Sequence, residues 1–478
     1  MNNNSKNPNL KKHQLKDEDN NRGYNNNHTI MAFFIMFIAG MGGVLYGYDI
    51  GIINGVLLFI TRDIPMNSLQ LGIIVGAVLI PSALATIVTG KLADWFGRRL
   101  MMQISSLVFF ISVIFLVLSN SYYMLLYSRW LQGLSVGIVV IVVPLYLAEI
   151  MPVHLRGRGV GVFQLLLTFG ILLGTFINYL LADTHDWKLM FATSAVPAVI
   201  LFIGCFFIPK SPRWLLMKGH SEKALKSLKS LNPIAKAKSE RDSINNHLIQ
   251  DNAEVGVGLA SFIRALGRRH FLVPFLIVIF VAILGQTTGI NSILQYAAII
   301  ISHAGLSSDS GALLGTNLIT AVNFIVTFIA LCLVDRVGRK FLLTIGTALV
   351  TASLIYCGCI YAFCPLGDTK AILLMIGLVV YIIGFAIGPG ACIFIILSEL
   401  LPSNIRSLGM GIAICLNSLV GGVFASYFLS FVEDIGYSGV FWVCAGLTFI
   451  YFLIVAFVLP ETKNKSLEEI EESFIKQK

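Results

Sequence analysis

The chain has 478 residues, of which 56% are hydrophobic and only 12% are charged, and its mean hydropathy is +0.82. Soluble globular proteins carry about a quarter charged residues, so this composition excludes a soluble globular protein and predicts a helical protein that crosses a lipid bilayer many times. The formal net charge of +9 does not indicate nucleic-acid binding, because the basic residues lie in short segments between apolar runs.

Taken in order, the chain alternates apolar runs with short polar connections. Residues 1–29 are rich in Asn and Lys and predict a disordered tail. Apolar runs long enough to span a bilayer at about 20 residues each then follow. There are twelve: 30–60, 69–91, 100–118, 122–148, 157–181, 189–208, 270–303, 311–333, 341–363, 371–401, 406–432 and 439–459.

A long polar stretch divides these twelve predicted spans into six and six. It covers residues 209–269, and the spacing of its apolar residues predicts short amphipathic helices. We therefore expect an all-α membrane protein in five parts. These are a disordered cytoplasmic tail (1–29), an N-terminal six-helix bundle (30–208), a cytoplasmic linker (209–269), a C-terminal six-helix bundle (270–460) and a cytoplasmic tail (461–478).

The Lys and Arg residues set the orientation. Of the 34, three (Arg62, Lys188 and Lys370) lie in the predicted outer loops, Arg129 lies inside a span, and the other 30 lie on the side of the termini and the linker. Cytoplasmic loops of membrane proteins carry the excess of basic residues. We therefore expect a multi-pass protein of the cell membrane with both termini in the cytoplasm.

A charged hairpin occurs once in each half of the chain. Asp94, Gly97, Arg98 and Arg99 lie between the second and third spans, and Asp335, Gly338, Arg339 and Lys340 repeat the pattern 241 residues later. Glycine permits the tight turn, and the acid can cap a helix or pair with an Arg. The repeat predicts two related halves.

A second pair of charged motifs supports the duplication. Glu149 and Arg156 follow the fourth span, and Glu399 and Arg406 follow the tenth, 250 residues later. Each charge could be only an interfacial anchor, but anchors need no matched spacing. We therefore predict a cytoplasmic gate of exposed, easily broken ion pairs. Its members are Asp94, Arg98, Arg99, Glu149, Arg156, Asp335, Arg339, Glu399 and Arg406.

Metal and catalytic chemistry are not indicated. The eight Cys residues lie almost entirely in apolar runs without metal-ligand spacing, and no cluster of His, Asp or Ser lies within the spans. We expect no metal, no cofactor, no disulfide framework and no enzymatic activity.

At this point the chain resembles a known family. The matching motifs include Gly47-Tyr-Asp49-Ile-Gly, both charged hairpins, Arg129-Trp-Leu-Gln-Gly133, Pro144-Leu-Tyr-Leu-Ala-Glu149, Pro209-Lys-Ser-Pro-Arg213, Gln286-Thr-Thr-Gly-Ile-Asn291 and Pro460-Glu-Thr-Lys463. In this order, they resemble the sugar porters of the major facilitator superfamily, which include bacterial sugar–proton symporters and facilitative glucose carriers. The resemblance implies two six-helix bundles, a central sugar site, and alternating access by rocking about it.

Two ionisable residues lie inside predicted spans. Asp49 is well within the first span and Arg129 within the fourth, and charges in a bilayer are costly and usually functional. We expect them to pair across the bundle, and protonation of Asp49 would release Arg129. A static structural pair is the alternative. In the family, an acid at the Asp49 position is typical of proton-coupled members.

Uncharged amides in the spans are candidates for sugar contact, because an amide offers both donors and acceptors to neighbouring hydroxyls. The alternative is hydrogen bonding between helices. By the resemblance, Gln164, Gln286, Asn291 and Asn323 fall on sugar-contacting positions, and Phe394 stands where the family usually has a stacking Trp. For Asn417 both interpretations stay open. The substrate-binding candidates are thus Gln164, Gln286, Asn291, Asn323, Phe394 and Asn417.

The sequence predicts a monomeric symporter that imports a monosaccharide or cyclic polyol with a proton. Gly285, Gln295 and Ala413 also depart from the usual family residues, which leaves the identity of the sugar open. A facilitative uniporter of the same fold and a non-transporting sugar sensor are the alternatives.

Overall fold

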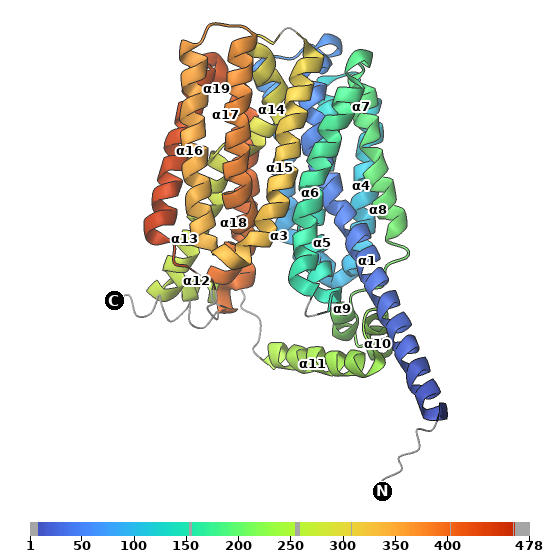
Figure 1. The fold of residues 1–478 in the computed structure, drawn as a ribbon. Coiled ribbons are helices and arrows are strands. Elements are labelled where there is room, and N and C mark those ends of the chain that lie inside the picture. The colour runs from blue at the N-terminus through green and yellow to red at the C-terminus, as the bar shows by residue number, and fades with distance from the viewer. Residues whose placement is uncertain are drawn as a thin grey trace.

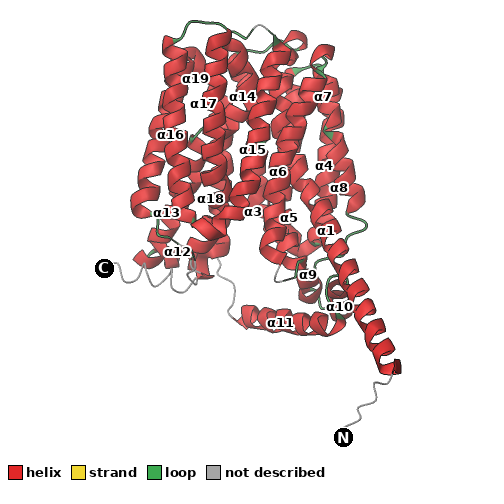
Figure 2. Ribbon diagram, viewed as in Figure 1, coloured by secondary structure: helices red, strands yellow, loops and turns green. Residues whose placement is uncertain are grey.

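The computed structural model describes residues 8–152, 155–253, 259–306, 308–401, 403–461 and 463. All regular structure in these residues is helical (Figure 2), which confirms the all-α prediction. The long helices stand side by side as one upright bundle (Figure 1). The helices of the first half are α1 (Pro8–Asp63), α2 (Ser68–Gly76), α3 (Leu79–Phe96), α4 (Arg98–Val117), α5 (Tyr122–Ile150), α6 (Arg156–Leu180), η2 (Ala182–Thr184), α7 (Trp187–Thr193) and α8 (Ala195–Gly204).

Four helices form the linker: α9 (Pro212–Met217), α10 (Ser221–Lys229), α11 (Ile234–Ala253) and α12 (Leu259–Leu266). The second half then repeats the long helices. It consists of α13 (Arg269–Thr287), α14 (Ile290–His303), α15 (Asp309–Val337), α16 (Arg339–Phe363), α17 (Asp368–Phe385), the π-helix η3 (Ala386–Gly390), α18 (Ala391–Leu400), α19 (Ser403–Leu453) and the π-helix η4 (Ile454–Val458).

Among the described residues, eleven helical stretches are long and apolar enough to cross a membrane. The last of them, Leu408–Val458, has 51 residues and interrupts its helical backbone at Gly436, where φ is 72° and ψ is 166°. A straight helix of that length would extend roughly 75 Å, more than twice the bilayer core. It therefore crosses twice, and the twelve predicted spans are present.

The start of α1, the end of η4 and the linker helices lie at one end of the bundle (Figure 1). We call this end the linker face and the opposite end the distal face. Helix α1 begins at Pro8, so it extends into the stretch 1–29 for which the composition predicts a disordered tail. Once a long helix exists, each added residue gains a hydrogen bond at little further cost, which accounts for this extension.

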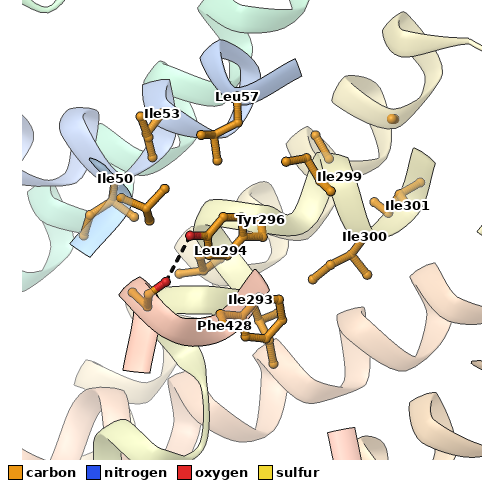
Figure 3. Close-up of a cluster of buried hydrophobic side chains, with 14 of the residues drawn as sticks. Ile50, Ile53, Leu57, Ile293, Leu294, Tyr296, Ile299, Ile300, Ile301 and Phe428 are labelled. Atoms are coloured by element: carbon orange, nitrogen blue, oxygen red, sulfur yellow. Dashed lines mark hydrogen bonds between the residues drawn. The ribbon is translucent and has the colours of Figure 1, made fainter. Parts of the chain in front are cut away.

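The two halves pack together on the distal side. One apolar cluster combines residues of both halves, whereas two others each belong to a single half with its adjoining linker residue. In the shared cluster, Ile50, Ile53 and Leu57 of α1 face the α14 segment that carries Leu294 and Ile299 (Figure 3).

Polar contacts between the halves are on the same side. The side-chain Nδ2 of Asn54 donates to the Leu294 carbonyl oxygen at 2.7 Å, and the hydroxyls of Thr175 and Thr320 lie 2.8 Å apart. Nearer the distal face, Arg62 pairs with Asp309 at 3.4 Å, and the Ser68 hydroxyl donates to Glu433. These four contacts between the halves all lie in the distal part of the bundle.

Candidate functional site

The predicted contact between Asp49 and Arg129 is present. Arg129 Nη1 lies 2.5 Å from Asp49 Oδ1, and the two residues are only 1% and 2% exposed. Asp49 comes from α1 and Arg129 from α5, so the pair joins two spans of the first half. A buried pair like this is stable only while both charges are kept, because either charge alone would be uncompensated.

Neutral groups complete the surroundings of Arg129. Its Nη1 also donates to Gln132 Oε1 at 2.8 Å, and its Nε donates to the Ile74 carbonyl oxygen at 3.4 Å. The guanidinium carbon lies 5.8 Å from the centre of the Phe191 ring. Arg129 therefore keeps neutral partners when Asp49 loses its charge.

Three of the substrate-binding candidates form one connected chain in the second half. Asn291 Nδ2 donates to Gln286 Oε1 at 2.7 Å, and Gln286 Nε2 donates to Asn417 Oδ1 at 3.0 Å. Asn417 in turn donates to the Ala282 carbonyl oxygen at 2.8 Å. Gln286, Asn291 and Asn417 are partly accessible, so they can still offer hydrogen bonds to a ligand.

A break in the seventh span brings these amides together. Helix α13 ends at Thr287, Gly289 adopts φ of 84°, and α14 begins at Ile290. Glycine adopts this left-handed conformation at little cost. The hydroxyl of Tyr381 donates to the Thr288 carbonyl oxygen at 3.1 Å, which satisfies one backbone group that the break leaves free.

The remaining predicted amides lie on α6 and α15, one helix from each half, which pack against each other. Gln164 is on α6 and Asn323 on α15, and neither side chain has a hydrogen-bond partner among the described residues. Contacts between Phe169 and Phe324, whose ring centres are 5.6 Å apart, join the same two helices. Phe394 belongs to α18, but its side chain lies outside what the structure describes.

The two charged hairpins have the same backbone turn. Gly97 has φ of 88° and ψ of 150°, and Gly338 has φ of 110° and ψ of 148°. Arg98 Nη1 donates to the Ala93 carbonyl oxygen, and Arg339 Nη1 donates to that of Val334, which is the matching residue 241 positions later. The duplication predicted from the motifs therefore extends to side-chain geometry.

The prediction of exposed gate pairs is wrong for Arg98 and Glu149 of the first half. Arg98 pairs with Glu149 at 2.8 Å, and these side chains are only 4% and 5% exposed. The hydroxyl of Ser211 also donates to Glu149 Oε2 at 2.5 Å. In the second half Arg339 lies 3.3 Å from Glu399, with side chains 14% and 24% exposed. Both pairs lie within one half, so they do not bridge the two halves.

Other predicted gate residues behave differently. Asp94 pairs with Arg98 at 2.9 Å, whereas Arg99 donates to the carbonyl oxygens of Phe206 and Ile208. The side chains of Arg156, Asp335 and Arg406 lie outside the described residues.

Sequence reasoning did not identify several partners of these residues. Gln132 and Ser211 could have been identified from the sequence, because both lie within motifs quoted above. Phe191 and the Ile74 carbonyl oxygen had none, since the approach of α2 and α7 to Arg129 depends on tertiary packing. Among the described residues, no group of three or more His, Cys, Asp or Glu could hold a metal ion.

Residues 35–474 match the family model described as "Sugar (and other) transporter". The chain is 35% identical over 441 residues to the "Glucose transporter GlcP" of Staphylococcus epidermidis, covering 92% of this chain and 96% of that one. It is 31% identical over 449 residues to the "Galactose-proton symporter" of Escherichia coli, covering 93% and 95%.

Among solved structures, the chain is similar to the inward open conformation of the xylose transporter XylE from Escherichia coli. The TM-score is 0.79 at 25% identity, covering 92% of this chain and 99% of that one. The proton:xylose symporter XylE bound to 6-bromo-6-deoxy-D-glucose gives a TM-score of 0.77 at 26% identity, covering 94% and 100%. With its twelve spans, its repeated hairpins and this match, the chain belongs to the sugar (and other) transporter family, a group of membrane carriers and not of enzymes, within the major facilitator superfamily.

Proposed function

We propose that this protein imports a monosaccharide or cyclic polyol together with a proton, by alternating access. The buried Asp49–Arg129 pair carries the proposal, because an acid 2% exposed inside a span is costly to keep without a role. Protonation of Asp49 removes its charge and frees Arg129, which keeps Gln132 as a partner. Relatives with the printed names "Galactose-proton symporter" and "Arabinose-proton symporter" support this coupling.

The substrate site in this proposal lies between the halves. Gln286, Asn291 and Asn417 provide a prearranged set of donors and acceptors on one side, and Gln164 reaches the substrate from α6 on the other. Asn323 is the further contact from α15 and Phe394 the apolar face for the ring carbons. Adjacent hydroxyls of a sugar or polyol match this set, because each amide can donate and accept.

The linker face is the cytoplasmic face in this proposal, since nearly all basic residues lie there. The charged hairpins act as the cytoplasmic gate, and the protein works as a monomer in the cell membrane. Because the halves are joined on the distal side, the described conformation corresponds to a carrier closed to the outside.

Uptake by reconstituted protein tests the proposal. Radiolabelled monosaccharides and cyclic polyols are offered to proteoliposomes with and without an inward proton gradient. A symporter concentrates its substrate only when the gradient is present. Equal uptake in both conditions would indicate the facilitative uniporter, and no uptake of any sugar that binds would indicate a sensor.

A further inference from the structure

Helices α4 and α16, which follow the two charged hairpins, begin in the same way. They differ in the group that accepts hydrogen bonds from their first backbone N–H groups. In the second half, the carboxylate of Glu461 accepts hydrogen bonds from the backbone N–H groups of Arg339 and Lys340, both at 3.2 Å. These are the first two residues of α16. A negative charge at a helix N-terminus is favourable, because the free N–H groups and the helix dipole both attract it.

No such carboxylate is present among the described residues of the first half. Helix α4 starts after Gly97 as α16 starts after Gly338, but the repeat places Lys210 where Glu461 stands, since Pro209-Lys210 corresponds to Pro460-Glu461. Among the described residues, no side chain accepts a hydrogen bond from the N–H groups of Arg98 or Arg99. The sign of the charge at this position is therefore reversed between the halves.

A cavity of about 210 Å³ occupies this position in the first half. Its basic lining residues are Arg98, Arg99 and Lys210, and none of the described residues that line it is acidic. Its walls are aromatic, with Trp214 covering Gly97 and with Phe96 and Phe206 at the rim, 51% and 56% exposed.

Two of the three basic residues have no acidic partner. Arg99 donates to the carbonyl oxygens of Ile208 at 3.0 Å and Phe206 at 2.8 Å, and no ion pair involves it within the described part of the chain. Lys210 Nζ lies 5.6 Å from the centre of the Trp214 ring, also without an ion pair there.

The third basic residue, Arg98, is only 4% exposed. Its Nη1 and Nη2 pair with Asp94 and Glu149. Its Nε has no hydrogen-bond partner among the described residues. An unpartnered buried N–H is costly, so an acceptor at this cavity would be stabilising.

We propose that this cavity binds a phosphate group, which occupies the place that Glu461 fills in the second half. The N–H groups at the start of α4 donate to it, and Arg99 and Lys210 supply the positive charge. A phosphate suits the site, because helix N-termini and basic side chains together form a common phosphate site. The exposed Phe96 and Phe206 at the rim suit a phospholipid of the adjacent leaflet, and a soluble phosphate shares the same chemistry.

Thermal unfolding of the purified full-length protein in detergent tests the binding. Inorganic phosphate is titrated against chloride at matched ionic strength. The unfolding midpoint of the wild type should rise and saturate. Lys210→Glu places a carboxylate of the protein itself where Glu461 stands in the second half. The unfolding midpoint of this variant should therefore not respond to phosphate. Lys210→Gln removes the positive charge without adding a carboxylate, so it loses one charged hydrogen bond and should bind phosphate about tenfold more weakly. Lys223→Glu makes the same charge change at an exposed residue of α10 and should respond as the wild type does.

The source of the phosphate is tested in nanodiscs of phosphatidylglycerol or phosphatidylcholine, followed by mass spectrometry of retained lipid. Retention of phosphatidylglycerol by the wild type and its loss in Lys210→Glu assigns the phosphate to a lipid. Stabilisation by inorganic phosphate without lipid retention assigns it to a soluble compound. The proposal is overturned if the wild type responds to neither probe, or if both Lys210 variants respond as the wild type does.

Discussion

Replacing Asp49 with Asn changes the charge of the buried pair and little else. The amide keeps the shape of the carboxylate and one acceptor oxygen, but Arg129, 1% exposed, loses its only acidic partner among the described residues. Breaking a buried pair costs about 3–5 kcal/mol. Because Gln132 and the Ile74 carbonyl oxygen still accept from Arg129, we expect a loss of unfolding free energy near the lower end of that range.

The functional effect of Asp49→Asn should be much larger than its effect on stability. A carrier that moves one proton with each sugar can concentrate the sugar about tenfold for each unit of pH difference, which corresponds to about 1.4 kcal/mol. The variant should reach only equal concentrations inside and outside, while exchange of labelled for unlabelled substrate continues. Uptake into proteoliposomes under an imposed pH gradient measures both. Asp183→Asn is the matched control, because it removes one acid from an exposed position at the end of the fifth span.

Two results would refute this reasoning. Normal accumulation by Asp49→Asn would show that another group carries the proton. A second test is Arg129→Met in the Asp49→Asn background, which removes the uncompensated charge and should recover much of the lost stability. No recovery would mean that the cost arises elsewhere.

The other predictions concern the substrate, the hairpins and the distal closure. Gln164→Ala and Gln286→Ala should each weaken sugar binding about tenfold to a hundredfold with near-normal thermal stability, as measured by calorimetry in detergent, and normal binding by both would place the site elsewhere. Arg98→Ala should slow turnover and lower stability more than Arg339→Ala, since its ion pair is more buried, while sugar affinity changes little in either; transport rates and melting curves compare them. Asn54→Ala removes one hydrogen bond between the halves, worth about 1 kcal/mol, and should open the distal side roughly fivefold more often, which the labelling rate of a cysteine placed in the shared cluster would detect.

The fold could be predicted from the sequence because its signals are local. Each span is a continuous apolar run, and the hairpins repeat the same residues at one offset, so Gly97 and Gly338 identify turns without any tertiary information. The Asp49–Arg129 contact was also predictable, because two opposite charges buried in one bundle can be stabilised most simply by each other.

The rest depended on how helices approach one another. Ser211, the N-cap residue of α9, donates to the carboxylate of the buried Arg98–Glu149 pair, and this contact depends on where α9 lies against α5. Arg99 donates to two backbone carbonyl oxygens of the segment that follows α8, and no residue pattern indicates such partners. The alignment of the amides likewise requires the break at Gly289, whose angle sets where Asn291 lies.

The hydrogen bonds between the halves affect the substrate concentration at which uptake by this carrier is half-saturated. Two buried hydrogen bonds and two exposed polar contacts hold the distal side closed, together worth a few kcal/mol. The hairpin ion pairs lie within each half and so need not break when the halves rock. A free-energy difference of a few kcal/mol between the closed and the open distal side leaves only a minority of molecules open on that side at rest. Substrate arriving there binds that minority, so its half-saturation concentration in uptake exceeds the intrinsic dissociation constant by the inverse of the accessible fraction.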